Sequence, residues 1–449
     1  MRRYHVTTFG CQMNVYDSSR LEGLLAAKGW ALAAAKEEAD FIFLNACSIR
    51  EKAAQRVIAR LKELKPLKKA RPEIIVGVGG CLAEQEGVNF LAKVPFLSLV
   101  AGPRRLEEIP ALLDTLDPHG PAVVLAGDSP KVATKPIYTP KKADLSSFVT
   151  IMEGCDNYCA YCVVPYLRGR EKSRPEEEVI KEVTQLLAKG AQEIVLLGQN
   201  VNSYAPNSLD ALNEPPFVSL LKKLDALPGL ARLRFTTSHP KDFSLELINL
   251  FGTLKTLAPS LHLPLQSGSD KILKAMGRKY DLNRYLDLVA NLRRVRPDIA
   301  LYTDIIVGFP GETEEDLALT IKALDLIQFD AIFSFKYSDR PQTKALNLPD
   351  KVPEEVKTDR LIRLQERQKA ISLVKNEAHI GSTVEVLVTG LGRHPGQLSG
   401  RTGGFKIVNF LGDSQLIGHF SAVTITGASA TSLTGELLSP LNESDVLSD

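Results

Sequence analysis

Residues 40–47, DFIFLNAC, have the character of a buried β-strand that ends in a cysteine. The stretch 48–65, SIREKAAQRVIARLKELK, follows with apolar residues at helical spacing. The apolar runs YHVTTFGC at 4–11 and EIIVGVGGC at 73–81 also end in cysteines. Apolar strands that alternate with helices are typical of a doubly wound parallel sheet, so we predict an α/β domain over residues 1–120.

The first cysteine triplet follows from this topology. Cys11, Cys47 and Cys81 each lie just past the carboxyl end of a predicted strand. In a parallel sheet those ends share one edge, where ligands bind. If the three strands are near neighbours in the sheet, the thiols form one site with three ligands. Zinc fits less well, because no histidine occupies a matching strand end.

A second triplet is local. In GCDNYCAYC, residues 154–162, Cys155, Cys159 and Cys162 lie within nine residues. A [4Fe–4S] cluster held by three cysteines leaves one iron open to an exogenous ligand such as S-adenosylmethionine. An electron from the cluster would then cleave the sulfonium to a 5′-deoxyadenosyl radical. Tyr161 is placed to lie against the adenine, or simply to pack within the loop.

Metal binding is favoured over disulfides by the expected compartment. The amino terminus, MRRYHVTTFGC, lacks the apolar core of a signal peptide, and no apolar run approaches the roughly 18 residues of a membrane span. We therefore expect a cytoplasmic protein, in which thiols stay reduced and grouped cysteines bind metals.

The central region repeats a β/α pattern over residues 148–375. Six strand candidates separated by helical stretches predict a (β/α)6 partial barrel, with its chemistry at the carboxyl ends of the strands. The second cysteine triplet follows the first of these strands. The strand candidates are SSFVTIMEG, EIVLLGQN, LRFTTSH, LHLPLQ, LYTDIIVGF and AIFSFKYS.

Two further boundaries complete the predicted organisation. Residues 121–147 are rich in proline and polar residues, as a linker would be. Short strands and glycine-rich turns predict a small all-β barrel over 376–440, followed by an acidic tail at 441–449. Three domains agree with 449 residues at roughly 150 per domain.

Polar residues at the mouth of the predicted barrel are candidates for orienting S-adenosylmethionine and the substrate. Each could instead cap a helix or end a strand, as Ser267 and Ser269 before a predicted helix illustrate. His239 and His262 are expected to be hydrogen-bonded strand residues. No catalytic residue beyond the cysteines is assigned. The candidates are Gln199, Asn200, Ser238, Gln266, Ser267, Asp304 and the turn that begins at Gly308.

The net charge of +2 means that any nucleic-acid site must be a local patch. One candidate is the basic run 60–71, and another is the group Arg293, Arg294 and Arg296. Either could equally be a solvated face. In the predicted β-barrel, Arg393, Arg401 and Lys406 accompany Phe405 and Phe410, which could form a basic-aromatic surface or part of a solvated barrel with a phenylalanine core.

The motifs together resemble a known family. CxxxCxxC after the first strand of a (β/α)6 unit resembles the radical S-adenosylmethionine superfamily. TTFGCQMNVYDS at 7–18, NACSIREKA at 45–53 and GGCLAEQEG at 79–87 resemble the amino-terminal domain of the methylthiotransferases. LLGQNVNSY, TSHP, LHLPLQSGSD and DIIVGFPGET resemble its radical domain, and the last region resembles its TRAM module. Ala46 departs from the threonine expected there, which should affect packing rather than ligands.

The resemblance implies an activity and its cofactors. The motifs CQMN and NACSIREKA resemble those of the subgroup of this family that acts on tRNA. This implies methylthiolation at C2 of N6-(dimethylallyl)adenosine at position 37, next to the anticodon. It also implies two [4Fe–4S] clusters, a radical cluster on the second triplet and an auxiliary cluster on the first, and two molecules of S-adenosylmethionine.

The expected partners are the tRNA anticodon stem-loop, an electron donor such as flavodoxin or ferredoxin, and a sulfur- or cluster-delivery protein. No membrane partner is expected, and the chain should be a monomer. Two alternatives remain open. One is the same chemistry on threonylcarbamoyladenosine of tRNA or on a ribosomal protein. The other is an RNA-binding protein with structural zinc.

Overall fold

The computed structural model describes residues 1–48, 51–127, 143–205 and 214–438. The chain divides into two compact units, Met1–Tyr158 with Cys162–Leu209, and Cys159–Tyr161 with Asp210–Asp449. Most of the expected linker and the acidic tail at 441–449 lie outside the described residues. None of the helices in the described ranges combines the length and apolar character that a bilayer crossing requires.

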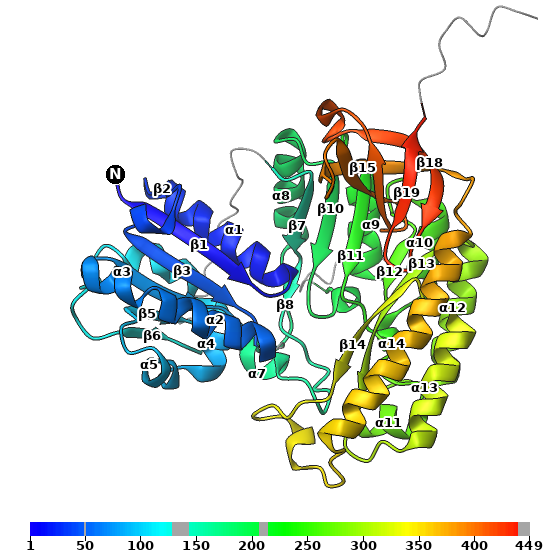
Figure 1. Cartoon of the computed structure of the whole chain (residues 1–449), viewed down its shortest axis with the longest axis horizontal. Coiled ribbons are helices and arrows are strands. Elements are labelled where there is room, and N and C mark those ends of the chain that lie inside the picture. The colour runs from blue at the N-terminus through cyan, green and yellow to red at the C-terminus, as the bar shows by residue number, and fades with distance from the viewer. Residues whose placement is uncertain (49–50, 128–142, 206–213, 439–449) are drawn as a thin grey trace, which may run out of the picture. The chain divides into compact units, whose positions relative to one another are not determined.

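The first unit begins with a six-stranded parallel sheet, which confirms the predicted α/β domain (Figure 1). Its order is β2-β1-β3-β4-β5-β6, so the three strands that precede cysteines, β1, β3 and β4, are adjacent. The strands are β1 (Arg3–Phe9), β2 (Ala31–Leu32), β3 (Phe41–Ala46), β4 (Ile75–Gly79), β5 (Leu99–Ala101) and β6 (Val123–Leu125). The helices are α1 (Gln12–Ala27), α2 (Glu51–Glu63), α3 (Lys65–Ala70), α4 (Cys81–Glu86), α5 (Asn89–Lys93) and α6 (Ile109–Leu112).

Strand β3 lies at the centre of this domain because every one of its residues is buried. Its side chains alternate between two apolar cores, as the period of two in a strand requires. Ile42 and Leu44 join the core under α2, whereas Phe41 and Phe43 join the core that contains Trp30. Ala46 is fully buried in the first of these cores, where it acts in packing.

The sheet extends further than the sequence pattern indicated. Residues 123–125, which fall within the expected linker, form β6 and pair in parallel with β5. Three apolar residues suffice for an edge strand, and the surrounding prolines and glycines concealed so short a run.

The six strands predicted for the central region are all present. In the first unit, β7 (Ser146–Thr150) pairs in parallel with β10 (Glu193–Leu197). The same unit holds β8 (Met152–Glu153), α7 (Val164–Arg168), β9 (Lys172–Ser173) and α8 (Glu176–Ala188). The strand β8 pairs antiparallel with β9, which joins the two ends of the segment 154–171 that contains the cysteine loop and α7.

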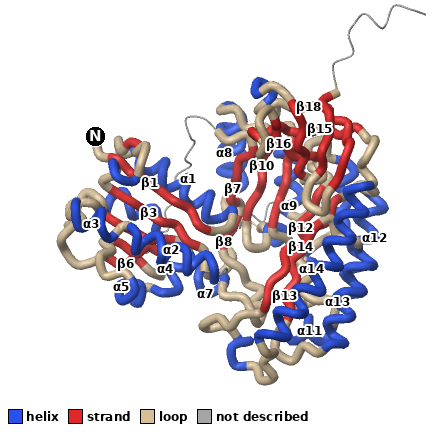
Figure 2. The backbone as a smooth tube through the Cα atoms, viewed as in Figure 1, coloured by secondary structure: helices blue, strands red, loops and turns tan. Residues whose placement is uncertain are grey.

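In the second unit, helices lie outside the other four strands predicted for the central region, β11–β14. The helices α12, α13 and α14 run side by side along β12–β14 (Figures 1 and 2). Strands β12, β13 and β14 pair in parallel in that order. The elements are α9 (Pro216–Asp225), β11 (Arg232–Thr236), α10 (Leu245–Thr253), β12 (Ser260–His262), α11 (Asp270–Ala275), α12 (Leu282–Val295), β13 (Ala300–Val307), α13 (Glu314–Ile327), β14 (Ala331–Lys336) and α14 (Glu354–Glu377). Short 3-10 turns complete the chain at η1 (Lys36–Glu38), η2 (Pro103–Glu108), η3 (Val201–Ser203), η4 (Pro240–Asp242), η5 (Lys344–Asn347) and η6 (Ser414–Leu416).

The carboxyl-terminal region is a closed five-stranded barrel, as predicted, in the order β15-β16-β17-β19-β18. Its strands are β15 (Thr383–Leu391), β16 (Gln397–Thr402), β17 (Ile407–Leu411), β18 (Phe420–Ala428) and β19 (Leu433–Leu437). Phe410 is buried in the barrel core with Val386 and Ile425. It therefore belongs to the interior, not to a basic-aromatic surface.

Contacts within the second unit attach this barrel to the β/α strands, and they involve main-chain oxygens at the end of β16 and in the turn that follows it. The donors come from β11 and β13, namely Arg232 to the Arg401 carbonyl (3.2 Å), Arg234 to the Thr402 carbonyl (2.9 Å) and Tyr302 to the Gly404 carbonyl (2.7 Å).

A buried carboxylate adds an ionic contact to the same attachment. Asp330, which precedes β14, binds Lys375 of α14 at 2.6 Å and Lys406 of the barrel at 2.8 Å. Lys406 also donates to Asn376, and only 9% of its side chain is exposed. Lys406 thus serves the interior of the unit and is not an exposed RNA contact.

Candidate metal centres and cofactor site

The first cysteine triplet lies at one edge of the N-terminal sheet. Cys11 is the N-cap residue of α1, Cys47 follows β3 and Cys81 begins α4. Because β1, β3 and β4 are adjacent and parallel, their carboxyl ends bring the three cysteines to one edge. The strand order reverses between β1 and β3, and such switch points are where open α/β sheets bind ligands.

The thiols of the first triplet influence one another. A hydrogen bond with Cys47 lowers the pKa of Cys11 to about 6, although burial acts in the opposite direction. Burial raises the pKa of Cys81, and Arg168 partly offsets that effect. At neutral pH the Cys11 thiol is therefore readily ionised, and the thiolate is the form that binds metals.

Glycines before two of these cysteines allow the strand ends to approach. A Cβ on Gly10 would lie 2.7 Å from Cys47 Cβ. Gly80 has φ +85°, and its Cβ would lie 2.6 Å from the Ala46 carbonyl oxygen. Side chains at either position would force the loops that carry Cys11, Cys47 and Cys81 apart.

Two buried asparagines hold these loops together. The Asn14 amide donates to Asn45 Oδ1 at 3.1 Å, and the Asn45 amide donates to the Asn14 carbonyl at 2.9 Å. Asn45 also donates to Ser18 Oγ. Neither asparagine was among the site residues predicted from sequence, although both lie in the motifs CQMN and NAC that carry the family resemblance.

Arg168 is a further residue that the sequence analysis missed. This buried arginine ends α7, six residues after Cys162. Its Nε donates to Cys81 Sγ at 3.4 Å, and its Nη2 donates to Asp17 Oδ2 at 2.6 Å. Glu153 lies 3.9 Å away, so the guanidinium has two carboxylate neighbours.

The second triplet lies in the loop between β8 and α7. The Cys155 amide donates to the Gly169 carbonyl at 3.1 Å, which anchors the loop. The Gly154 amide donates to Gln199 Oε1 at 2.6 Å. Gln199, a candidate for binding S-adenosylmethionine, thus supports the backbone directly before Cys155.

Cys159 is held within the second unit. The following residue, Ala160, donates to the Met276 carbonyl and accepts from the Ala345 amide, both at 2.8 Å. The half-buried Arg278 donates through Nη1 to Cys159 Sγ at 3.4 Å. Arg278 also donates to Tyr280 Oη and the Pro264 carbonyl, but no carboxylate forms an ion pair with it among the residues that the structure describes.

Two of the cofactor candidates carry buried polar atoms without partners. Ser238 Oγ follows β11, and Gln266 Oε1 lies between β12 and α11; neither has a hydrogen-bond partner within the described ranges. Gln266 also has φ +74°, and its main chain is fixed by Asp304 and Ile306. A buried polar group usually has a partner, so these two atoms are suited to a bound ligand.

The remaining candidates make contacts within the protein. Ser267 bonds Thr320 and the Ser269 amide, and Ser269 caps α11, as the alternative interpretation suggested. The Gly308 amide donates to Glu312 at 2.6 Å. Asn200 is fully buried, and Tyr161 packs beside an apolar cluster that includes Met276 and Phe309.

Of the two histidines expected in strands, His262 ends β12, whereas His239 lies past the end of β11 as the N-cap residue of η4. His262 Nδ1 lies 3.4 Å from Thr236 Oγ1, and its Nε2 is 3.2 Å from Asp304 Oδ2 but outside hydrogen-bond alignment. His239 Nδ1 accepts from the Lys241 amide at 3.2 Å, and burial lowers its pKa to about 2. His239 is therefore a neutral structural residue.

Three cysteines in each triplet are a donor set that fits an iron–sulfur cluster. None of the six cysteines, all of which lie in the described ranges, forms a disulfide. In the described part of the chain, no three His, Cys, Asp or Glu side chains converge closely enough to hold one ion. A zinc site needs its ligands around a single centre, whereas a cubane binds each thiolate through a different iron. The guanidiniums beside Cys81 and Cys159 would also balance negative charge on a bound cluster.

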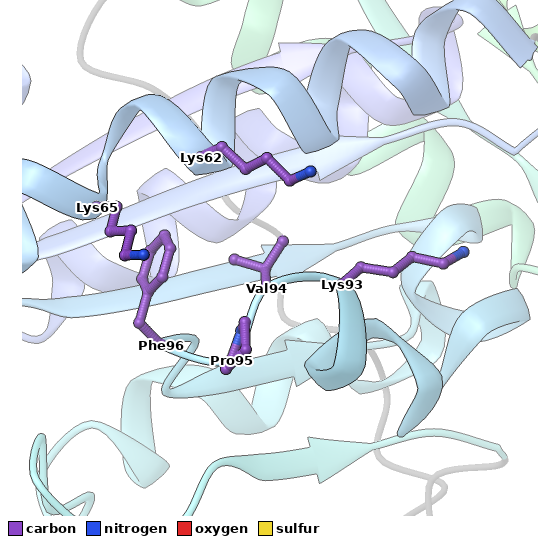
Figure 3. Close-up of a pocket in the computed structure, with 6 residues that line it drawn as sticks. All are labelled: Lys62, Lys65, Lys93, Val94, Pro95 and Phe96. Atoms are coloured by element: carbon purple, nitrogen blue, oxygen red, sulfur yellow. The ribbon is translucent and has the colours of Figure 1, made fainter.

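In the basic run 60–71, some basic side chains bind within the protein and others are exposed to solvent. Lys68 donates to the Pro72, Ile74 and Pro118 carbonyls, so it holds the fold. Lys62 and Lys65 are exposed and line a groove of about 440 Å³ with Lys93, Val94, Pro95 and Phe96 (Figure 3). This groove is lined by no cysteine, so it is separate from the candidate metal centres. In the second basic group, Arg293 bonds the Ile327 carbonyl and Arg296 pairs with Asp298, whereas Arg294 is exposed.

Comparisons with known proteins agree with this arrangement. Residues 3–102 match the uncharacterized protein family UPF0004, residues 149–324 the radical SAM superfamily, and residues 377–438 the TRAM domain. The tRNA-2-methylthio-N(6)-dimethylallyladenosine synthase of Thiobacillus denitrificans is 45% identical over 97% of this chain and 98% of its own length. The protein of the same name from Syntrophobacter fumaroxidans is 45% identical over 98% and 96%. The chain belongs to the radical S-adenosylmethionine methylthiotransferase family.

This methylthiotransferase is therefore an enzyme, and its superfamily implies S-adenosylmethionine and a [4Fe–4S] cluster as cofactors. Its fold resembles the radical S-adenosylmethionine methyltransferase TsrM from Kitasatospora setae, with a TM-score of 0.57 and 14% identity over 77% of this chain and 75% of that one. The cobalamin-dependent radical enzyme OxsB has a TM-score of 0.52 and 13% identity over 82% and 56%. At these identities the likeness concerns the fold.

Proposed function

We propose that this methylthiotransferase modifies tRNA at C2 of N6-(dimethylallyl)adenosine at position 37, next to the anticodon. Two relatives of that name match it over nearly their full lengths at 45% identity. The TRAM match at residues 377–438 supports an RNA substrate.

The observation that carries the proposal is the arrangement of cysteines. Cys11, Cys47 and Cys81 come together at the switch edge of a parallel sheet, and the same chain carries the CxxxCxxC loop at 155–162. One cluster alone could make a radical. A second site with three cysteines gives the enzyme a place from which to donate sulfur.

The residues divide between these tasks. Cys155, Cys159 and Cys162 would hold the radical cluster, and Cys11, Cys47 and Cys81 the auxiliary cluster. When bound, the clusters and S-adenosylmethionine supply the electron, methyl group and sulfur that side chains cannot. Ser238 and Gln266 would hydrogen-bond S-adenosylmethionine through the buried oxygens that lack protein partners. Tyr161 would lie against its adenine.

Partners follow from the same chemistry. The adenosine lies in a single-stranded loop, and unstacked loop bases are the usual targets of RNA readers. The proposal places the monomeric enzyme in the cytoplasm, where thiols stay reduced. It also requires an electron donor such as flavodoxin or ferredoxin and a protein that delivers sulfur or clusters.

Nucleoside analysis tests the substrate. Cells that lack the protein should lose 2-methylthio-N6-(dimethylallyl)adenosine and accumulate the form without the methylthio group. Expression of the chain should restore it, and expression of Cys11→Ala should not. Loss of a methylthiolated threonylcarbamoyladenosine or of a ribosomal-protein modification instead would contradict the assignment.

Metal analysis tests the centres. Anaerobically purified chain should hold about eight irons with matching sulfide, four for each cubane. Alanine at Cys155, Cys159 and Cys162 should leave about half the iron and abolish cleavage of S-adenosylmethionine. Zinc without sulfide would support a structural-metal protein and overturn the enzyme mechanism.

A further inference from the structure

Each cysteine triplet includes one sulfur that accepts a hydrogen bond from an arginine of its own unit. Arg168 donates to Cys81 in the first triplet and Arg278 to Cys159 in the second, each at 3.4 Å. Both arginines are distant in sequence from the cysteines that they contact, by 87 and 119 residues. The fold therefore provides one cationic donor for each triplet.

The two arginines differ in how their charge is balanced. Arg168 forms a buried ion pair with Asp17, whose side chain is 2% exposed, and it has Glu153 as a more distant second neighbour. Arg278 donates its other hydrogen bonds to neutral groups, Tyr280 Oη at 3.0 Å and the Pro264 carbonyl at 3.1 Å. Within the described ranges no carboxylate pairs with it.

This difference matters for a redox centre. Reduction adds one negative charge to a cluster, so a nearby positive charge stabilises the reduced form, and hydrogen bonds to the sulfurs act in the same direction. An arginine beside a buried carboxylate offers its hydrogen bond but little net charge. An arginine without a carboxylate offers both.

We propose that Arg278 raises the reduction potential of the cluster on Cys155, Cys159 and Cys162, whereas Asp17 cancels most of the same effect of Arg168 on the auxiliary cluster. The pair of arginines thereby directs the incoming electron to the centre that cleaves S-adenosylmethionine and keeps the sulfur-donating centre oxidised. This inference rests on the proposed function, because it needs a cluster at each triplet.

The experiment uses full-length chains that retain a single cluster. In one background Cys11, Cys47 and Cys81 are alanine, and in the other Cys155, Cys159 and Cys162 are alanine. Iron and sulfide are counted first, and midpoint potentials are then measured by anaerobic titration monitored by electron paramagnetic resonance. Zinc or missing sulfide in the parent backgrounds would contradict the proposed function itself.

In the first background, Arg278→Gln should shift the redox equilibrium of the cluster at least tenfold toward the oxidised form. For one electron this lowers the midpoint potential by about 59 mV. Arg278→Lys should stay within threefold of the parent, because it keeps the charge. Arg293→Gln is the matched control, since it also removes a carbonyl-bound arginine from the second unit without a cysteine contact.

In the second background, Asp17→Asn should raise the potential by a comparable factor, because it removes the directly paired carboxylate and leaves only the more distant Glu153 beside Arg168. Opposite signs from the two variants would not arise from general damage to the fold. If Arg278→Gln loses its iron, the Asp17→Asn result decides. A potential within threefold of the parent for Asp17→Asn, or for iron-loaded Arg278→Gln, would overturn the proposal.

Discussion

Replacing Asp330 by asparagine should loosen the barrel from the β/α strands of the second unit. The Asp330 carboxylate binds Lys375 at 2.6 Å and Lys406 at 2.8 Å, and it accepts from the Leu301 amide at 2.9 Å. Its side chain is only 3% exposed. Asparagine can still accept from Leu301, but it leaves two ammonium groups without a counter-charge.

The magnitude follows from the burial of these groups. Breaking a buried ion pair costs about 3–5 kcal/mol, because the remaining charge stays desolvated. Burial already lowers the pKa of Lys375, so this lysine can release its proton and relieve part of the cost. We therefore expect the lower end, a loss of about 3 kcal/mol in the free energy that attaches the barrel to the β/α strands.

Hydrogen exchange read by mass spectrometry is the assay. A loss of about 3 kcal/mol should speed exchange by more than about 100-fold at those amides of β15–β19 that become exposed when the barrel detaches. Trp30, the single tryptophan, lies in the core of the N-terminal sheet. The urea concentration at which its fluorescence reports unfolding should be the same in the variant and the parent, and this serves as an internal reference.

The matched control is Asp325→Asn, which removes an exposed carboxylate that pairs with Arg367 between α13 and α14. Exposed pairs contribute about 0–1 kcal/mol, so exchange in the barrel should stay close to the parent. If Asp330→Asn changed barrel exchange no more than this control does, the buried ionic contact would not hold the barrel.

Three further changes test the site. Burial lowers the pKa of His239 to about 2, so between that pH and about pH 6.5 the unfolded chain binds a proton at this residue and the folded chain does not. The free energy of unfolding measured in urea should therefore be highest above about pH 6.5 and fall by about 2 kcal/mol by pH 5. His239→Gln should make the free energy of unfolding less dependent on pH over this range. Ser238→Ala should leave stability unchanged or slightly higher but weaken S-adenosylmethionine binding about tenfold in equilibrium dialysis, and unchanged affinity would contradict the assigned contact. Gly80→Ala should cost about 1–3 kcal/mol in urea unfolding followed by Trp30 fluorescence, because the backbone conformation at Gly80 suits only glycine.

The sheet edge was predictable because topology limits where strand ends can lie. Three apolar strands that each end in a cysteine, together with the rule for parallel sheets, were enough to bring Cys11, Cys47 and Cys81 together. The edge strand β6 was not predicted, because it has only three residues within the short apolar run AVVLA at 122–126, which carries little periodic signal. Ala46 met the expectation of a packing role.

The contacts of individual side chains at the site were harder to predict from the sequence. Gln199 and Gln266 both follow strands of the central region, yet one supports the Gly154 amide and the other has a buried oxygen without a partner. Strand-end position alone cannot separate these outcomes. Arg168 and Arg278 were missed because their contacts with cysteines span long stretches of chain and form only after the elements pack.

The attachment of the barrel has a consequence for how this enzyme can change over time. Arg232, Arg234 and Tyr302 donate to carbonyl oxygens at the end of β16 and in the turn that follows it, and every amino acid offers that oxygen. Substitutions at the acceptor positions therefore leave these oxygens in place. A lineage can therefore alter the side chains at the end of β16 and in this turn while the barrel stays attached to the β/α strands.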